Sequence, residues 1–250
     1  MTELSYLRHG DGQLAYRRRD GKEPGIVWLG GFMSDMTGTK AQAVDAWAAR
    51  SGRACLRFDY SGHGRSSGAF TDGTISRWRD DALAAIDAQS RGPQILIGSS
   101  MGGWIAMLVA RLRPERVAGI LLIAPAADMT EALMWQRMPE DVRRQIAEQG
   151  LWLRPSDYGD GPYPITRALI EDGRRNLILG EAIAVSCPVR ILQGMADPDV
   201  PWQHAMKLAA AIDGDVVTTL VKNGDHRLST PPDIRLLERT LDALIEDVGS

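Results

Sequence analysis

The chain is 250 residues long, with 44% hydrophobic and 24% charged residues, which is typical of a globular protein with a sizeable core. Its formal net charge of −3 is too small to indicate a nucleic-acid partner or an anionic membrane surface as a ligand. No run approaches the roughly 18 apolar residues of a membrane span, so stable membrane insertion is not expected either.

Short apolar runs alternate along the chain with segments whose apolar residues recur three and four apart. The first two segments, 4–7 and 13–18, flank His9-Gly10-Asp11-Gly12, which predicts an antiparallel hairpin. Further strands are predicted at 26–29, 55–58, 94–97, 117–124, 189–192 and 216–221, with helices at 39–50, 75–89 and 101–113. This alternation indicates repeated βαβ units. We therefore predict an α/β fold with a mostly parallel sheet flanked by helices, in a single domain spanning residues 1–250.

The segment from Asp128 to about Ala184 interrupts this alternation, because no strand is predicted within it. Its length of roughly 55 residues far exceeds an ordinary connection of about 2–6 residues. We predict a helical cap insertion at about 128–184 that covers an active site. Large apolar side chains recur in it at helical spacing and either line a pocket for a flexible chain or only pack the cap onto the core (Met129, Met134, Trp135 and Met138).

The strongest chemical signal is Gly98-Ser99-Ser100-Met101-Gly102, which matches the pattern G-x-S-x-G. It directly follows the predicted strand 94–97 and opens the predicted helix 101–113, and a nucleophile elbow requires this strand–turn–helix setting. The glycines on both sides let neighbouring backbone pass a strained turn without a Cβ clash. We therefore predict Ser100 as a catalytic nucleophile.

A serine hydroxyl needs a base to remove its proton, and only two of the four histidines follow Ser100 in the order serine–acid–histidine. One of them, His204, lies in the predicted first turn of a helix, where a solvated or capping role is expected. The other, His226, lies in a polar turn just after the last predicted strand, at the sheet edge from which a base can reach the elbow. His226 is therefore the predicted base.

The acid that orients the base is predicted to be Asp197, which lies immediately past the predicted strand 189–192. About one helix and one strand separate it from His226, and this separation suits two adjacent loops. Asp199 is two residues away, so spacing does not distinguish it from Asp197. Asp128 follows the preceding strand, which is a third position for the acid. Both stay open as alternatives.

The negative charge that develops on an attacked carbonyl oxygen needs two backbone N–H donors. Met101, directly after the nucleophile, is predicted to supply one of them. Gly30-Gly31-Phe32 follows the predicted strand 26–29, and the Phe32 N–H is predicted to supply the other. This loop matches no nucleotide-binding pattern, and no side chains have metal-ligand spacing, so neither a cofactor nor a metal is expected.

Cys55 and Cys187 both lie in apolar stretches, so each is predicted to be a buried thiol outside any disulfide framework. The first residues, Met1-Thr2-Glu3-Leu4-Ser5, lack the basic-then-apolar pattern of a secretory signal. These features predict a cytoplasmic protein.

The motifs GGF, RFDYSGHGRSSG, GSSMGGW, GMADPDVPW and GDHR occur in this order and resemble those of the α/β-hydrolase superfamily over almost the whole chain. More narrowly, residues 38–41, 57–62, 98–104, 200–202 and 225–227 are similar to the palmitoyl-protein thioesterases with α/β-hydrolase domain 10. This resemblance implies an α/β-hydrolase fold and hydrolysis of S-palmitoyl thioesters and acyl-glucuronide esters. It also implies that Ser100, Asp197 and His226 are the nucleophile, acid and base.

The sequence thus predicts a serine esterase or thioesterase that acts on a small-molecule or acylated substrate through an acyl-enzyme. Two alternatives stay open. The same elbow could support C–C bond hydrolysis or perhydrolysis, or the chain could be a binding module that kept the fold without catalysis.

Overall fold

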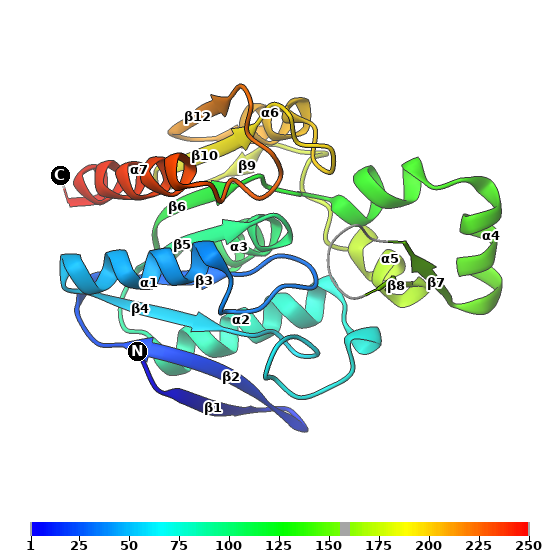
Figure 1. Cartoon of the computed structure of the whole chain (residues 1–250), viewed down its shortest axis with the longest axis horizontal. Helices are drawn as coiled ribbons and strands as arrows, with labels where there is room; N and C mark the ends of the chain where they lie inside the picture. Colours follow the sequence, from blue (N-terminus) through cyan, green and yellow to red (C-terminus); the bar gives the residue numbers. More distant parts are fainter. Residues whose placement is uncertain (1, 156–160, 250) are drawn as a thin grey trace.

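The structure is a computed structural model that describes residues 2–155 and 161–249. Its centre is an eight-stranded sheet in the order β1-β2-β4-β3-β5-β6-β10-β12 (Figure 1). The hairpin β1–β2 is antiparallel, as predicted, β2 is also antiparallel to β4, and the other neighbouring pairs of this sheet are parallel. The strands are β1 (Leu4–His9), β2 (Gly12–Arg19), β3 (Lys22–Leu29), β4 (Arg53–Phe58), β5 (Gln94–Ser99), β6 (Val117–Ile123), β10 (Val189–Gly194) and β12 (Val216–Val221).

Helices cover both faces of this sheet because its central strands are apolar on both sides. Successive residues of β3 show the pattern, since Ile26 belongs to a buried cluster with residues of α1 and α7, whereas Val27 belongs to a second cluster with residues of α2, α3 and α6. The predicted α/β fold with a mostly parallel sheet is confirmed. These helices are α1 (Thr39–Ser51), α2 (Ile75–Gln89), α3 (Met101–Leu112), α6 (Trp202–Ala211) and α7 (Pro231–Gly249).

The segment between β6 and β9 forms a group of elements at one end of the molecule, toward which the arrow of β4 points (Figure 1). It contains helical turns and helices, but also an antiparallel pair of strands, β7 and β8. The prediction that this segment lacks strands is therefore wrong, because strands of four residues are too short to show a reliable period of two. Its elements are η3 (Thr130–Met134), η4 (Trp135–Arg137), α4 (Glu140–Gln149), β7 (Leu151–Arg154), β8 (Tyr163–Thr166) and α5 (Arg167–Arg174).

Both cysteines are free and buried, as predicted. Burial raises the pKa of the Cys55 thiol to about 12 and that of the Cys187 thiol to about 11, so both stay protonated and behave as small apolar side chains. Over residues 2–155 and 161–249, no helix combines the length and the apolar character that crossing a membrane requires. The remaining short elements are η1 (Phe70–Asp72), η2 (Pro114–Arg116), β9 (Ile183–Ala184) and β11 (Ile212–Asp213).

Candidate active site

Ser100 lies in the sharp turn between β5 and α3, where its backbone has φ 53° and ψ −117°. A non-glycine residue rarely adopts such a positive φ, and it persists only where the surroundings enforce it. Here the neighbouring backbone packs too closely for side chains. A Cβ at Gly98 would lie 2.4 Å from the Gly102 carbonyl oxygen, and one at Gly102 would lie 2.0 Å from the Leu29 carbonyl oxygen. The turn therefore needs both glycines of the G-x-S-x-G pattern.

His226 lies in the loop after β12, and its Nε2 is 3.1 Å from the Ser100 Oγ. Its Nδ1 is 2.8 Å from Asp197 Oδ2. Because an ionised carboxylate only accepts hydrogen bonds, Nδ1 carries the proton and Nε2 accepts from the serine hydroxyl. The structure thus brings Ser100, His226 and Asp197 together in a continuous chain of hydrogen bonds.

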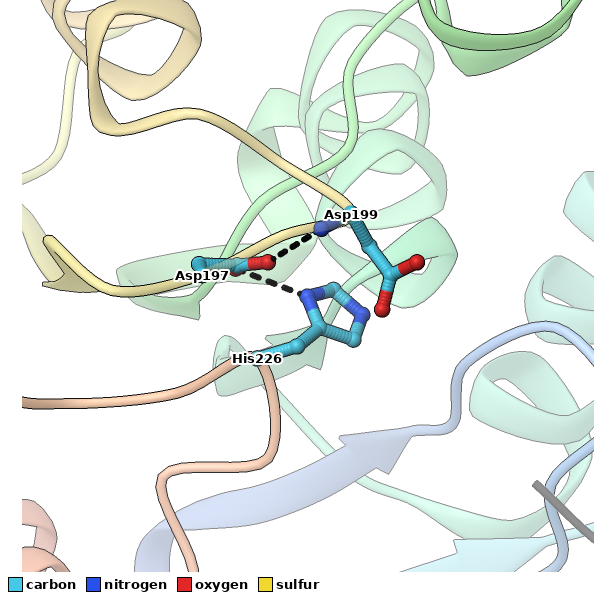
Figure 2. A group of neighbouring side chains, drawn as sticks. All are labelled: Asp197, Asp199 and His226. Atoms are coloured by element: carbon cyan, nitrogen blue, oxygen red, sulfur yellow. Dashed lines mark hydrogen bonds and ion pairs between the residues drawn. The ribbon is translucent and has the colours of Figure 1, made fainter. Parts of the chain in front are cut away.

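Asp197 lies in the loop after β10 with a fully buried side chain (Figure 2). While Oδ2 faces the imidazole, Oδ1 accepts from the backbone N–H groups of Asp199 and Val200, each at 2.9 Å. The neighbouring backbone joins this loop to that of His226, since the Ala196 N–H donates to the Gly224 carbonyl oxygen at 3.0 Å. The acid and the base are therefore held relative to each other by main-chain as well as side-chain bonds.

The carboxylates of the two alternative acids are placed differently from that of Asp197. Asp199 contributes its backbone N–H to Asp197, and its carboxylate projects past the His226 ring rather than toward Nδ1 (Figure 2). Asp128 accepts from the backbone N–H groups of Ile178 and Leu179 at 2.8 and 3.0 Å, so it ties the end of the inserted segment to the end of β6. Desolvation by burial raises the pKa of its carboxyl, against these hydrogen bonds.

His204 is buried, and its Nε2 lies 2.6 Å from the Ala127 carbonyl oxygen. The prediction of a solvated or capping role is therefore wrong. The residue does lie in the first turn of α6, but that turn faces the loop after β6, which the sequence does not reveal. Burial lowers the pKa of its imidazole, so a neutral ring that donates to the carbonyl is favoured.

The two segments predicted to supply N–H donors both border Ser100. Met101 is the first residue of α3, where a backbone N–H has no acceptor within the helix. In the other segment, a Cβ built on Gly31 would lie 3.4 Å from the Ser100 Cβ, so this loop passes directly beside the nucleophile. The Phe32 ring fixes the loop by edge-to-face contacts with three other rings, at centroid distances of 4.9 Å (Phe70), 5.8 Å (Trp78) and 5.6 Å (Tyr163).

A cavity of about 1090 Å³ opens onto Ser100 and His226. Its wall beneath the inserted segment is largely apolar (Met129, Leu133, Met134, Met138, Trp152 and Tyr163). Its other end, beside the start of α1, is polar and includes Lys40, which the sequence reasoning missed. The Lys40 Nζ donates to the Arg227 carbonyl oxygen, next to His226, and burial lowers the pKa of this amine to about 8. An isolated lysine in a helix has no sequence signal that would reveal this contact.

Asp197, Asp199 and His226 also have potential ligand atoms within 4.8 Å of one another, a composition that can hold a metal ion (Figure 2). Both oxygens of Asp197 are, however, occupied by hydrogen bonds from protein donors. The ring nitrogens of His226 are likewise used, one by Asp197 and the other by Ser100. The group therefore fits an acid–base pair better than a set of metal ligands.

His63, which precedes the nucleophile in the chain, is buried against the Phe70 and Trp78 rings. Burial lowers the pKa of its imidazole to about 4, against a weaker opposing effect of the Ser61 carbonyl oxygen. The unfolded chain therefore binds this proton near pH 6.5, whereas the folded chain resists it down to about pH 4. We expect this group to reduce the free energy of unfolding by up to about 3 kcal/mol as the pH falls through that range.

This expectation is tested by urea unfolding at pH 7 and at about pH 4.5, for the wild type and for His63→Phe, whose ring suits the surrounding aromatic side chains. The other titrating groups are common to both proteins. The free energy of unfolding of the variant should therefore fall by about 2 kcal/mol less than that of the wild type on acidification. Equal losses in the two proteins would show that His63 is not held neutral by the fold.

The fold and the site define the class of protein. The model of the alpha/beta hydrolase family matches residues 25–235, and the chain belongs to this family. It is 40% identical to the human palmitoyl-protein thioesterase ABHD10, mitochondrial, over 252 aligned residues that cover 100% of this chain and 82% of the relative. Among solved structures, a putative hydrolase from Agrobacterium vitis S4 superposes with a TM-score of 0.93 at 46% identity, covering 98% of both chains. The mouse alpha/beta hydrolase domain-containing protein 10 does so with a TM-score of 0.90 at 40% identity, again covering 98% of both chains.

The prediction of a cytoplasmic protein is contradicted by these comparisons, because the relatives from human, orangutan (Pongo abelii) and cattle (Bos taurus) are named as mitochondrial. The prediction failed because it relied on cysteines. Unpaired, buried cysteines are compatible with any reducing compartment, so they do not distinguish one such compartment from another.

Proposed function

We propose that this hydrolase cleaves carboxylic ester and thioester bonds through an acyl-enzyme, with Ser100 as nucleophile, His226 as base and Asp197 as acid. The observation that carries the proposal is the chain of hydrogen bonds from Ser100 Oγ through His226 to Asp197 Oδ2, at 3.1 and 2.8 Å. It is supported by the strained backbone of Ser100, which presents the hydroxyl at the floor of the cavity.

In the first step, His226 Nε2 takes the proton of Ser100 Oγ while Oγ attacks the substrate carbonyl carbon. The carbonyl oxygen becomes an oxyanion, which the backbone N–H groups of Met101 and Phe32 would stabilise. The protonated imidazole is stabilised by the Asp197 carboxylate. It then donates its proton to the leaving thiol or alcohol, the bond to that group breaks, and Ser100 carries the acyl group as an ester.

In the second step, His226 removes a proton from a water molecule, which attacks the acyl-enzyme in the same way. The carboxylic acid leaves, and Ser100 recovers its proton from the imidazole. In every proton transfer, His226 is one partner. The other is the oxygen of Ser100, the oxygen of water, or the oxygen or sulfur of the leaving group, so the cycle needs no further co-reactant.

We propose acyl thioesters with long chains as the substrate class. The relatives named palmitoyl-protein thioesterase suggest a long acyl group, and the apolar wall beneath the inserted segment supplies a surface suited to one. Methionine side chains on this wall can adapt to a flexible alkyl chain (Met129, Met134 and Met138). The lining of the cavity therefore favours a pocket for the acyl chain over mere packing.

We further propose that the whole chain acts as one domain, with the insertion at about 128–184 serving as a cap. Two sets of contacts support this role. Asp128 binds the backbone N–H groups of residues 178 and 179, which joins the two ends of the insertion to each other. The Arg137 guanidinium donates to the Asp199 carbonyl oxygen at 3.4 Å, which joins the insertion to the loop after β10. Tyr163 of β8 also packs on Phe32, so the insertion contacts the predicted oxyanion loop directly.

The acyl pocket is tested by turnover of thioesters with acyl chains of about 2 to 16 carbons. We expect kcat/KM of the wild type to rise with chain length, because each buried methylene adds about 0.8 kcal/mol of transfer free energy. Leu133→Asp places a charge on the half-buried apolar wall and should lower kcat/KM for the palmitoyl thioester by about tenfold or more, with little effect on an acetyl thioester.

The matched control is Leu153→Asp, since Leu153 belongs to the same insertion but is 52% exposed and does not line this cavity. This variant should keep the wild-type dependence on chain length. A wild type that prefers short acyl groups, or equal effects of the two substitutions, would contradict the proposed acyl pocket.

A further inference from the structure

Gln193 is a fully buried polar residue in the last part of β10, directly before the loop that carries Asp197. Its Nε2 lies 2.9 Å from the Gly194 carbonyl oxygen, 3.0 Å from the Val200 carbonyl oxygen and 3.2 Å from Asp197 Oδ2. All three partners are acceptors, so the amide nitrogen, not the amide oxygen, faces the loop. The two hydrogens of the amide are therefore shared among three acceptors, which lie at both ends of the loop and on the carboxylate between them.

The contact with Asp197 is made to the oxygen that also faces His226. Asp197 Oδ1 is held by the backbone of residues 199 and 200, and Oδ2 receives the Nδ1–H of His226 and the Nε2–H of Gln193. The backbone bonds restrain the carboxylate through Oδ1. The Gln193 amide adds a restraint at Oδ2, the oxygen on which the orientation of His226 depends.

We propose that Gln193 is a positioning residue, which acts through Asp197 to keep His226 aligned with Ser100. The inference rests on the proposed function, because it assigns Gln193 a role only if Asp197 orients the base. A second observation separates this role from ordinary packing. Among the residues that the structure describes, none pairs with the buried Gln193 Oε1. An unpaired buried carbonyl oxygen lowers stability, so a side chain needed only for packing would be better apolar.

The test is a double-mutant cycle with a substrate ester, comparing Gln193→Met, Asp197→Asn and the double variant with the wild type. Gln193→Met keeps the length of the side chain but removes its donor. We expect kcat/KM to fall by about tenfold or more in the wild-type background, with KM changed by less than about twofold, because hydrogen bonds to charged groups are among the strongest. In the Asp197→Asn background the same substitution should change kcat/KM by less than about twofold.

The matched control is Gln94→Met. Gln94 is also a glutamine buried in a strand of the sheet, but it lies at the amino end of β5, at the opposite end of the strands from the catalytic loops. Its Nε2 binds Glu23 and nearby backbone carbonyl oxygens, so the substitution removes comparable bonds without touching the acid. Gln94→Met should lower the unfolding temperature but leave kcat unchanged. Equal losses of kcat/KM from Gln193→Met with and without Asp197→Asn would overturn the positioning role.

If Gln193→Met does not fold, Gln193→Glu supplies an independent test. A protonated carboxyl group can still donate one hydrogen bond, whereas the ionised group would repel Asp197 and two carbonyl oxygens. The activity of this variant relative to the wild type should therefore fall as the pH rises, and a ratio independent of pH would overturn the proposal. Ser100→Ala separates the two levels of inference. Activity that survives it defeats the proposed function, whereas an inactive Ser100→Ala with a null result at Gln193 defeats only this inference.

Discussion

Replacing Ser100 with alanine is expected to abolish turnover of both esters and thioesters, with kcat falling by about 10⁶-fold. The variant loses the oxygen that lies 3.1 Å from His226 Nε2, so no acyl-enzyme can form. KM should change little, because the wall of the cavity is retained. Single-turnover measurements with an ester that releases a chromophore, together with mass spectrometry of the trapped acyl-enzyme, check both the rate and the covalent intermediate.

Ser99→Ala is the matched control, because Ser99 is the adjacent serine but ends β5 and lies outside the strained turn. Its activity should stay within about tenfold of the wild type. Turnover by Ser100→Ala at the wild-type rate would refute the assignment of Ser100 as the nucleophile. A wild type that binds acylated ligands but hydrolyses none of them would instead favour the binding module, and cleavage of diketones in preference to esters would favour C–C hydrolysis.

Asp197→Asn is expected to lower kcat by about 10⁴-fold while leaving the unfolding temperature nearly unchanged. The asparagine amide would place a donor against His226 Nδ1, which favours the tautomer that carries its proton on Nε2. Such a ring cannot accept the proton of Ser100. The loss should therefore fall on kcat rather than KM, and steady-state kinetics of a short ester measure it directly.

The two alternative acids supply the controls for this prediction. Asp199→Asn keeps the backbone N–H that binds Asp197, so its kcat should fall by less than about tenfold. Asp128→Asn should mainly lower the unfolding temperature, because the Asp128 carboxylate binds two backbone N–H groups near residue 178. A larger loss of kcat in Asp199→Asn or Asp128→Asn than in Asp197→Asn would show that the acid has been misassigned.

The features that the sequence predicted well depend on residues that are close together in the chain. The hairpin of β1 and β2 follows from a polar turn between two short runs, and the elbow follows from glycines at fixed offsets from Ser100. The parallel sheet follows from the regular alternation of apolar runs and helical segments. In each case local sterics and hydrophobic periodicity are sufficient, so no knowledge of distant contacts was needed.

The features that the sequence did not predict depend on packing between distant segments. His204 is buried because α6 packs against the loop after β6. The strands β7 and β8 are too short for their sequences to show a period of two. The contact between Phe32 and Tyr163 joins the first βα loop to the insertion, far along the chain. Neither Phe32 nor Tyr163 lies in a sequence pattern that predicts this contact.

By itself, the sequence determined the α/β fold and a short set of candidate catalytic residues, because the hydrophobic pattern and the turn residues are properties of the chain itself. It left three aspartates as candidates for the acid. Only the tertiary structure decided that Asp197, and neither Asp199 nor Asp128, directs its carboxylate at His226 Nδ1. The order of strands β6, β10 and β12 in the sheet brings the loops of Asp128, of Asp197 and Asp199, and of His226 to one edge. The hydrogen bonds within the structure then set where the Asp128 and Asp197 carboxylates point.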